Sequence, residues 1–156
     1  MMTPRQYRDT PVDVKLVLCA LWVTVLFVFA YVDIFGLYRA DVLDAALDGK
    51  MATTAFTVDQ VFLTSTLIYI LPPILMVVLT LLLTPRVNRT VNIVVSFLYS
   101  ISIIVSCIGE TWIYYLLGSL IEVLLLAVIA RAAWRWPSPA VAPPLATRGR
   151  PSWWNS

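Results

Sequence analysis

Residues 112–133 read WIYYLLGSLIEVLLLAVIARAA, a run whose only charged members are Glu122 near its middle and Arg131 near its end. At a rise of 1.5 Å per residue, roughly 20 apolar residues cross the ~30 Å hydrocarbon core of a bilayer. Three runs of similar length and character precede it, at 14–36, 62–83 and 91–108. The sequence therefore predicts an all-α integral membrane protein, a bundle of four transmembrane helices.

The overall composition agrees with four spans and excludes other classes of protein. Of the 156 residues, 60% are hydrophobic and 13% are charged, and the mean hydropathy is +0.86. A soluble domain is typically about 45–50% apolar and about 25% charged. The charges are too few to cover a water-facing surface, which excludes an ordinary soluble enzyme, and the apolar content excludes a disordered chain. We expect the lipid bilayer as the partner and no nucleic acid.

Basic residues gather on one side of the predicted membrane domain. Only Arg39 and Lys50 fall on the side opposite the termini. The other nine of the eleven basic residues fall near the N-terminus, between the second and third spans, or in the C-terminal segment: Arg5, Arg8, Lys15, Arg86, Arg89, Arg131, Arg135, Arg148 and Arg150. The positive-inside rule therefore predicts that both termini are cytoplasmic.

The polar segments divide the chain into three parts. An N-terminal arm (1–13) precedes the membrane domain (14–136), and a Pro-rich tail (137–156) follows, which we expect to be disordered. We expect the first span to be retained rather than cleaved as a signal peptide, because acidic residues dilute the basic segment before it.

The connections between the spans predict which of them are neighbours. The third and fourth spans are joined by a tight turn at 109–111, and the second and third by a short connection at 84–90, so each pair should lie antiparallel. Only the connection at 37–61 is long. Apolar residues recur at helical spacing within 41–47, which predicts a short interfacial helix that Gly49 ends.

Residue types that support metal or thiol chemistry are scarce. Cys19 and Cys107 lie at depths on the order of 20 Å apart, too far for a disulfide. The absence of histidine excludes haem held by histidine and argues against a zinc or copper centre. No nucleophile–base pair, phosphate-binding loop or pair of catalytic carboxylates is present. We expect no cofactor, no metal and no enzymatic activity.

Glu122 is the most informative residue, because it falls near the bilayer midplane. A charge is expensive there, and no Lys or Arg lies at that depth in any predicted span. We therefore expect a protonated carboxyl that donates a hydrogen bond to a neighbouring helix. One interpretation is a proton or cation site, or a polar anchor for a ligand. The other is a hydrogen bond that only holds helices together.

Two adjacent prolines, Pro72 and Pro73, fall at the same depth in the second span. Each removes a backbone hydrogen bond, so the carbonyls of Ile68 and Tyr69 need another donor. Glu122 is one candidate donor, and broken helices at the midplane often line binding sites. The alternative is a kink that only shapes the packing.

The third span carries a polar stripe within an arc of roughly 160°. Its small residues, spaced by four, would let a neighbouring helix approach closely, and Gly118 and Ser119 on the fourth span suit such an approach. The stripe is either a close packing surface or the lining of a hydrated or ligand-binding groove. Its members are Asn92, Ser96, Tyr99, Ser100, Ser102 and Ser106.

Asp33 lies about two residues inside the outer end of the first span, where charge is tolerated. It either caps the turn into the long connection, with Gly36 supplying a permissive backbone, or binds at the outer mouth of the bundle. The rise per residue separates Asp33 from Glu122 by about 10 Å in depth.

Short motifs recur in or beside all four spans. They are Tyr31-x-Asp33-x-x-Gly36-Leu37, Asp59-Gln60-x-Phe62-Leu63, Asn88-Arg89-x-x-Asn92-Ile93, and Tyr114-Tyr115 ahead of Glu122. In this order and spacing they resemble a family of small bacterial four-helix membrane proteins classed as a domain of unknown function, number 6326. The similarity covers roughly residues 12–136. It implies a multi-pass protein of a bacterial inner membrane and transfers no activity.

Three functional hypotheses follow. The first is a non-enzymatic bundle that binds a small lipophilic ligand or a partner helix. The second is a small proton- or cation-coupled transporter that acts as a homo-oligomer and uses Glu122. The third is an enzyme acting on lipid, for which the sequence offers no recognisable nucleophile or metal site. Of the three, we prefer the first. The predicted site residues are Glu122, Tyr69, Pro72, Ser96, Tyr99 and Asp33.

Overall fold

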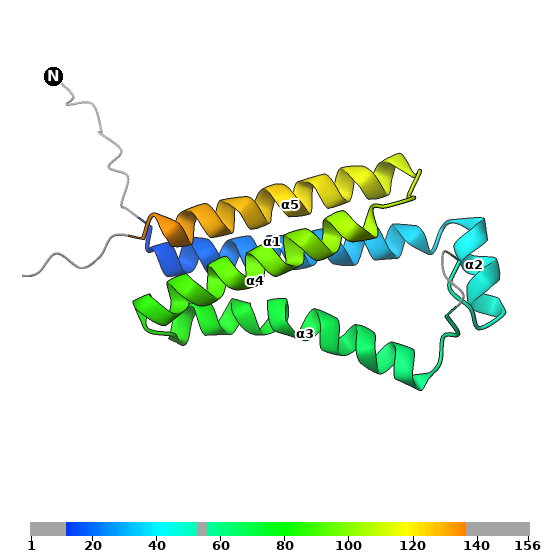
Figure 1. The fold of residues 1–156 in the computed structure, drawn as a ribbon, viewed down its shortest axis with the longest axis horizontal. Helices are drawn as coiled ribbons and strands as arrows, with labels where there is room; N and C mark the ends of the chain where they lie inside the picture. Colours follow the sequence, from blue (N-terminus) through cyan, green and yellow to red (C-terminus); the bar gives the residue numbers. More distant parts are fainter. Residues whose placement is uncertain (1–11, 53–55, 137–156) are drawn as a thin grey trace, which may run out of the picture.

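A computed structural model describes residues 12–52 and 56–136, and within them the fold is entirely helical (Figure 1). Four helices of 22 or 23 residues are long and apolar enough to cross a membrane. The four predicted spans are therefore confirmed. Most of the N-terminal arm and the Pro-rich tail lie outside the described residues. The long helices are α1 (Val14–Gly36), α3 (Gln60–Leu82), α4 (Pro85–Ser106) and α5 (Ile113–Trp134).

The long helices form an up-and-down bundle. α1 packs against both α3 and α5, and α4 packs mainly against α5, its antiparallel neighbour across the predicted tight turn. Lys15 Nζ donates to the carbonyls of Leu81 (3.0 Å) and Leu83 (2.9 Å), which joins the start of α1 to the end of α3. Figure 1 shows α3 changing direction near its middle, so that its first half diverges from the other long helices. Residues 12 and 136 lie at one end, which we call the terminal end.

The predicted connection at 84–90 is wrong, because α4 begins at Pro85 rather than near residue 91. Proline suits the first position of a helix, where its missing N–H would be unpaired in any case. The polar residues that follow it are typical of a loop, but Asn88 is fully buried in the bundle. The third helix therefore gains nearly two turns at the terminal end.

Most of the apolar core lies in the half of the bundle nearest the terminal end. Trp22, Leu18 and Val25 of α1 are completely buried there, together with Met76 of α3. On α5, Leu126 and the residues one and two turns after it are buried as well. The centre of this half is therefore occupied by large side chains.

A chain of buried polar groups runs through the same half. Trp22 Nε1 donates to Asn92 Oδ1 (2.8 Å), and Asn92 Nδ2 donates to the Asn88 Oδ1 and backbone oxygens (2.6 and 2.9 Å). Asn88 Nδ2 donates to the Thr80 carbonyl (2.5 Å) and so reaches α3. All four residues have 0% exposure. Three helices are thus locked together where water is unavailable to pair these groups.

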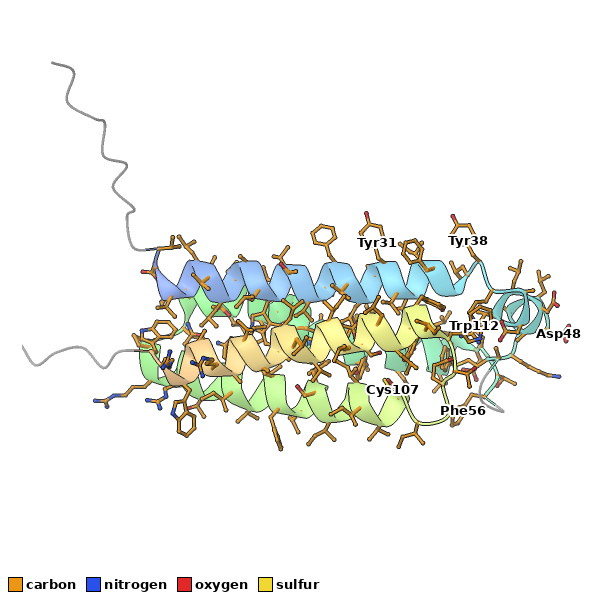
Figure 2. All side chains as sticks on the ribbon, turned by 90° about the horizontal axis from the view of Figure 1, so that it is seen from above. Tyr31, Tyr38, Asp48, Phe56, Cys107 and Trp112 are labelled. Atoms are coloured by element: carbon orange, nitrogen blue, oxygen red, sulfur yellow. The ribbon has the colours of Figure 1, made fainter. Side chains whose placement is uncertain are left out.

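Polarity is distributed inside out relative to a soluble protein. Large apolar side chains project from the outer faces of the long helices, and Tyr31 and Tyr38 point away from the bundle (Figure 2). Buried positions, by contrast, include many polar residues. This arrangement fits a bundle whose outer surface faces lipid. The buried polar side chains within the long helices are Thr80, Asn88, Asn92, Ser96, Ser119 and Glu122.

The short helix α2 (Ala40–Leu47) confirms the helix expected at 41–47. Gly49 adopts φ +69°, and its N–H donates to the Ala46 carbonyl (3.1 Å). The N–H of Lys50 donates to Ala45 (2.8 Å), which completes a Schellman motif. Gly49 therefore ends the helix as predicted. We call this side of the bundle the α2 end.

Arg39 ties α2 to the turn between α4 and α5. Its guanidinium binds both carboxylate oxygens of Asp41 (2.7 and 3.1 Å) and reaches Glu110 Oε2 at 3.4 Å. It also lies 4.4 Å from the ring centre of Trp112, at the α2 end (Figure 2). Burial by itself would raise the pKa of Glu110. The carboxylate accepts hydrogen bonds from the backbone N–H groups of Trp112 and Thr111 and lies beside the Arg39 guanidinium. Together these contacts outweigh burial and lower the pKa of Glu110 below its ordinary value. The contacts of Arg39 therefore join the start of α2 to the turn between α4 and α5.

Candidate functional site

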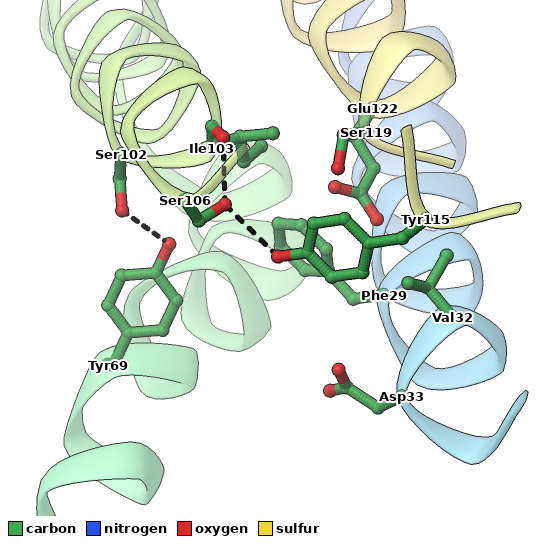
Figure 3. Close-up of a pocket in the computed structure, with 10 residues that line it drawn as sticks. All are labelled: Phe29, Val32, Asp33, Tyr69, Ser102, Ile103, Ser106, Tyr115, Ser119 and Glu122. Atoms are coloured by element: carbon green, nitrogen blue, oxygen red, sulfur yellow. Dashed lines mark hydrogen bonds between the residues drawn. The ribbon is translucent and has the colours of Figure 1, made fainter. Parts of the chain in front are cut away.

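A cavity of about 250 Å³ lies in the half of the bundle nearest the α2 end, opposite the apolar core. All four long helices contribute to its wall, and the diverging first half of α3 forms one side (Figures 1 and 3). The cavity exists because the core residues of α1, α3 and α5 are concentrated in the other half. Its lining residues are Phe29, Val32, Asp33, Tyr69, Ser102, Ile103, Ser106, Tyr115, Ser119 and Glu122.

Glu122 lies at the inner part of this cavity. It is the tenth residue of α5, so it lies about 14 Å along the axis from the start of that helix. Only 3% of its surface is exposed, and its Oε1 has no hydrogen-bond partner among the described residues. Figure 3 shows the carboxyl pointing between Ser119 and Phe29. A buried carboxyl oxygen without a partner is costly in apolar surroundings, so a group that enters the cavity would find an available acceptor.

Two tyrosine–serine pairs supply hydroxyl groups to the cavity. Tyr69 Oη lies 2.8 Å from Ser102 Oγ, which joins α3 to α4. Tyr115 Oη donates to Ser106 Oγ (3.1 Å), which joins α5 to α4 (Figure 3). Hydroxyls both donate and accept, so each pair can reorient toward a ligand. The α4 wall is therefore polar without being charged.

Asp33 and Tyr69 mark where the cavity opens. Both line it and both are exposed, Asp33 on α1 and Tyr69 on the diverging half of α3. Figure 3 shows them on the same side of the cavity, away from Ser119 and Glu122. Ser106 of α4 lines the cavity and is exposed as well, so the opening is bordered by α1, α3 and α4. A molecule would pass a carboxylate at the mouth before reaching the second carboxyl within.

The carbonyl that Pro73 frees in α3 does not pair with Glu122. The Tyr99 hydroxyl of α4 donates to the Tyr69 carbonyl instead. The prediction of Glu122 as the donor is therefore wrong, because a tyrosine from the neighbouring helix already satisfies this carbonyl. Glu122 therefore does not replace the backbone hydrogen bond that Pro73 removes from α3.

The structure brings some of the predicted site residues together and separates others. Glu122, Tyr69 and Asp33 line one cavity, although the first and last differ in depth. Tyr99 supports the wall from behind through its hydrogen bond, and Pro72 is exposed and outside the lining. Ser96 is buried outside the lining, and its Oγ has no partner among the described residues.

Sequence reasoning assigned the close approach of Gly118 to the wrong helix. A Cβ at this position would lie 2.3 Å from Cγ2 of Val32, so Gly118 admits α1 rather than the serine stripe of α4. Tyr115 and Ser119 line the cavity but were not among the predicted site residues. Their positions seven and three residues before Glu122 put them on the same helical face, which is the signal that identifies them.

Metal binding has little support in the described part of the chain. No group of three or more Cys, Asp or Glu side chains is placed there to hold an ion. The two carboxyls of the cavity stand on different helices, α1 and α5, and the serines and tyrosines complete the polar lining.

Comparison with known proteins identifies the family. A family model described as a family of unknown function (DUF6326) matches residues 10–142. The chain belongs to this family. No curated protein and no solved structure matches the chain. The resemblance noted in the four spans is thereby confirmed, and since the family has no assigned function, the cavity itself must suggest one.

Proposed function

We propose that this protein is a non-enzymatic membrane receptor, a bundle that holds a small lipophilic molecule in the cavity between α1, α3, α4 and α5. The observation that carries the proposal is at Glu122: its Oε1 is buried and has no partner in the described chain, and the residue lines a space of about 250 Å³. A carboxyl that served only to hold helices together would be paired across an interface. A ligand with a hydrogen-bond donor would complete it.

The division of the bundle into a packed half and a hollow half favours binding over transport. A carrier exposes its site to each side of the membrane in turn. Here the terminal half is filled by Trp22, Met76 and Leu126 and is tied by the polar chain through Asn92. The exposed lining residues, Asp33, Tyr69 and Ser106, lie in the other half, which suits capture from one side.

The orientation of the site follows from the distribution of basic residues. With both termini cytoplasmic by the positive-inside rule, the cavity opens toward the outer leaflet of a bacterial inner membrane. A ligand would enter laterally from lipid, past Asp33 and Tyr69, without crossing the packed half.

The alternative is proton- or cation-coupled transport by an oligomer that uses Glu122. The depth of this carboxyl, about 14 Å from the end of α5, favours it, since ionisable groups at such depth mark proton and ion pathways. It requires a second copy to complete the pathway, because one bundle is closed at the terminal half.

Native mass spectrometry of the protein released from detergent tests the proposal. We expect the wild-type protein to carry a co-purified small molecule and Glu122→Leu to lose it. Asp44→Asn is the matched control, because it removes an exposed carboxyl on α2, outside the cavity lining. The proposal would be refuted if the wild type and Glu122→Leu carried the same amount of the co-purified molecule. It would also be refuted if the wild-type protein were empty and no added compound bound to it.

A further inference from the structure

The ionisable carboxyl and amine or guanidinium side chains that line the cavity are all of the acidic kind. Asp33 on α1 and Glu122 on α5 contribute two carboxyls, whereas no Lys or Arg is among the described residues that line it. At the α2 end, the basic side chain of Arg39 is already held by Asp41 and Glu110. A ligand that carried a negative charge would meet two carboxyls and no counter-charge.

Three aromatic rings complete this wall. Phe29 of α1, Tyr69 of α3 and Tyr115 of α5 come from three different helices and surround the same space (Figure 3). Aromatic faces attract cations, and the attraction is strongest where water is excluded. Carboxyls combined with aromatic rings are the residue types that recognise an ammonium group with an apolar body.

The size and depth of the cavity restrict the ligand further. A cavity of about 150 Å³ holds benzene, so about 250 Å³ accommodates one ring with short substituents. Glu122 lies about 14 Å along α5 from its start, which is deeper than the headgroup layer of a membrane. The ammonium group of a lipid headgroup at the surface would therefore reach Asp33 but not Glu122.

We propose that the cavity binds a free lipophilic ammonium compound, whose cation lies between Asp33 and Glu122 and whose apolar body lies against Phe29, Tyr69 and Tyr115. This inference rests on the proposed binding function and adds the chemical class of the ligand. Asp33 at the mouth attracts the cation from the interface. Glu122, with its unpaired oxygen, holds it at depth.

A matched pair of probes tests the class. Benzyltrimethylammonium and neopentylbenzene have the same shape, but only the first carries a charge. Lipid-stripped protein in neutral maltoside micelles is titrated with each by calorimetry against protein-free micelles. We expect the cation to bind at least about tenfold more tightly than its neutral counterpart, as carboxyl and aromatic contacts in a desolvated site imply.

Variants locate the site. Glu122→Gln and Asp33→Asn should each weaken binding of benzyltrimethylammonium by about tenfold or more, whereas Asp44→Asn should bind as the wild type does. Asp33→Asn keeps the test decisive if Glu122→Gln fails to fold, because Asp33 is exposed.

The outcomes separate the two proposals. If neopentylbenzene binds as tightly as the cation, or if both carboxyl variants bind the cation normally, the ammonium class is wrong, while a co-purified molecule in the native mass spectrum still supports a binding function. If neither probe binds and the native spectrum shows no occupant, both proposals fall. If short-chain phosphatidylethanolamine binds and benzyltrimethylammonium does not, a lipid headgroup is the ligand and the inference of a free compound is overturned.

Discussion

Replacing Gly118 by alanine tests how closely α1 and α5 approach beside the cavity. The added Cβ would lie 2.3 Å from Cγ2 of Val32, about 1 Å short of ordinary contact. Val32 cannot easily turn aside, because a β-branched side chain in a helix is held near one rotamer. The two helices must therefore separate locally or the valine must leave its preferred geometry.

The expected magnitude is the difference of two terms. Overpacking of this kind lowers the free energy of unfolding by about 1–3 kcal/mol. Replacing a glycine by alanine in a helix interior raises it by about 1 kcal/mol. The difference is about 0–2 kcal/mol, so we expect Gly118→Ala to lower the free energy of unfolding by up to about 2 kcal/mol. In a Val32→Ala background the same change should be neutral or stabilising, which gives a coupling of similar size.

The chain supplies a matched control for this substitution. Gly36 lies in the same helix pair, but a Cβ there would meet the Tyr114 hydroxyl at 3.5 Å, an ordinary contact. Gly36→Ala should therefore leave stability unchanged or slightly higher. Unfolding is followed by far-UV circular dichroism while the SDS fraction of maltoside micelles is raised. If Gly118→Ala matches Gly36→Ala, or if Val32→Ala does not rescue it, the close approach of α1 and α5 is refuted.

Three further predictions use the same unfolding titration. Asn92→Leu should lower the free energy of unfolding by about 1–3 kcal/mol, because the indole N–H of Trp22 loses its acceptor in the membrane interior. A loss smaller than that of an outward-facing substitution would show that the hydrogen bonds of Asn92 do not stabilise the bundle. Tyr99→Phe should lower the free energy of unfolding by about 1 kcal/mol, because it removes the hydroxyl that donates to the Tyr69 carbonyl. In a Pro73→Ala background this loss should be smaller, because the backbone N–H of residue 73 can then donate to the same carbonyl. The pKa of Glu110 is lowered in the folded protein, so its charge stabilises the folded state at neutral pH. That stabilisation should be lost as the pH falls below about 4. The unfolding midpoint of Glu110→Gln should therefore depend less on pH in this range than that of the wild type.

Some parts of the site were accessible from single positions in the sequence. Glu122 was recognisable because an acidic residue in the middle of an apolar span is expensive and rare. The inward stripe of α4 was recognisable from helical periodicity, and Asn92, Ser96 and Tyr99 are indeed buried. The short helix before Gly49 was recognisable from apolar spacing and a C-terminal glycine.

Other features depend on which helices meet, and no local pattern encodes that. The start of α4 at Pro85 was missed because Asn88 is typical of a loop until Asn92 and Thr80 pair with it. The donor to the carbonyl of Tyr69 is a side chain 30 residues away in sequence, Tyr99, which only the packing of α3 beside α4 brings near.

The sequence by itself determined that the chain crosses the membrane four times, because the length and hydropathy of each run depend only on local composition. Family membership agrees with this. The tertiary structure decided that one half of the bundle is packed and the other hollow, and that Asp33, Tyr69 and Glu122 border the same cavity. The physical reason is that core volume and helix divergence arise from contacts among four helices at once. A period of 3.6 residues identifies an inward face but not the helix that it faces.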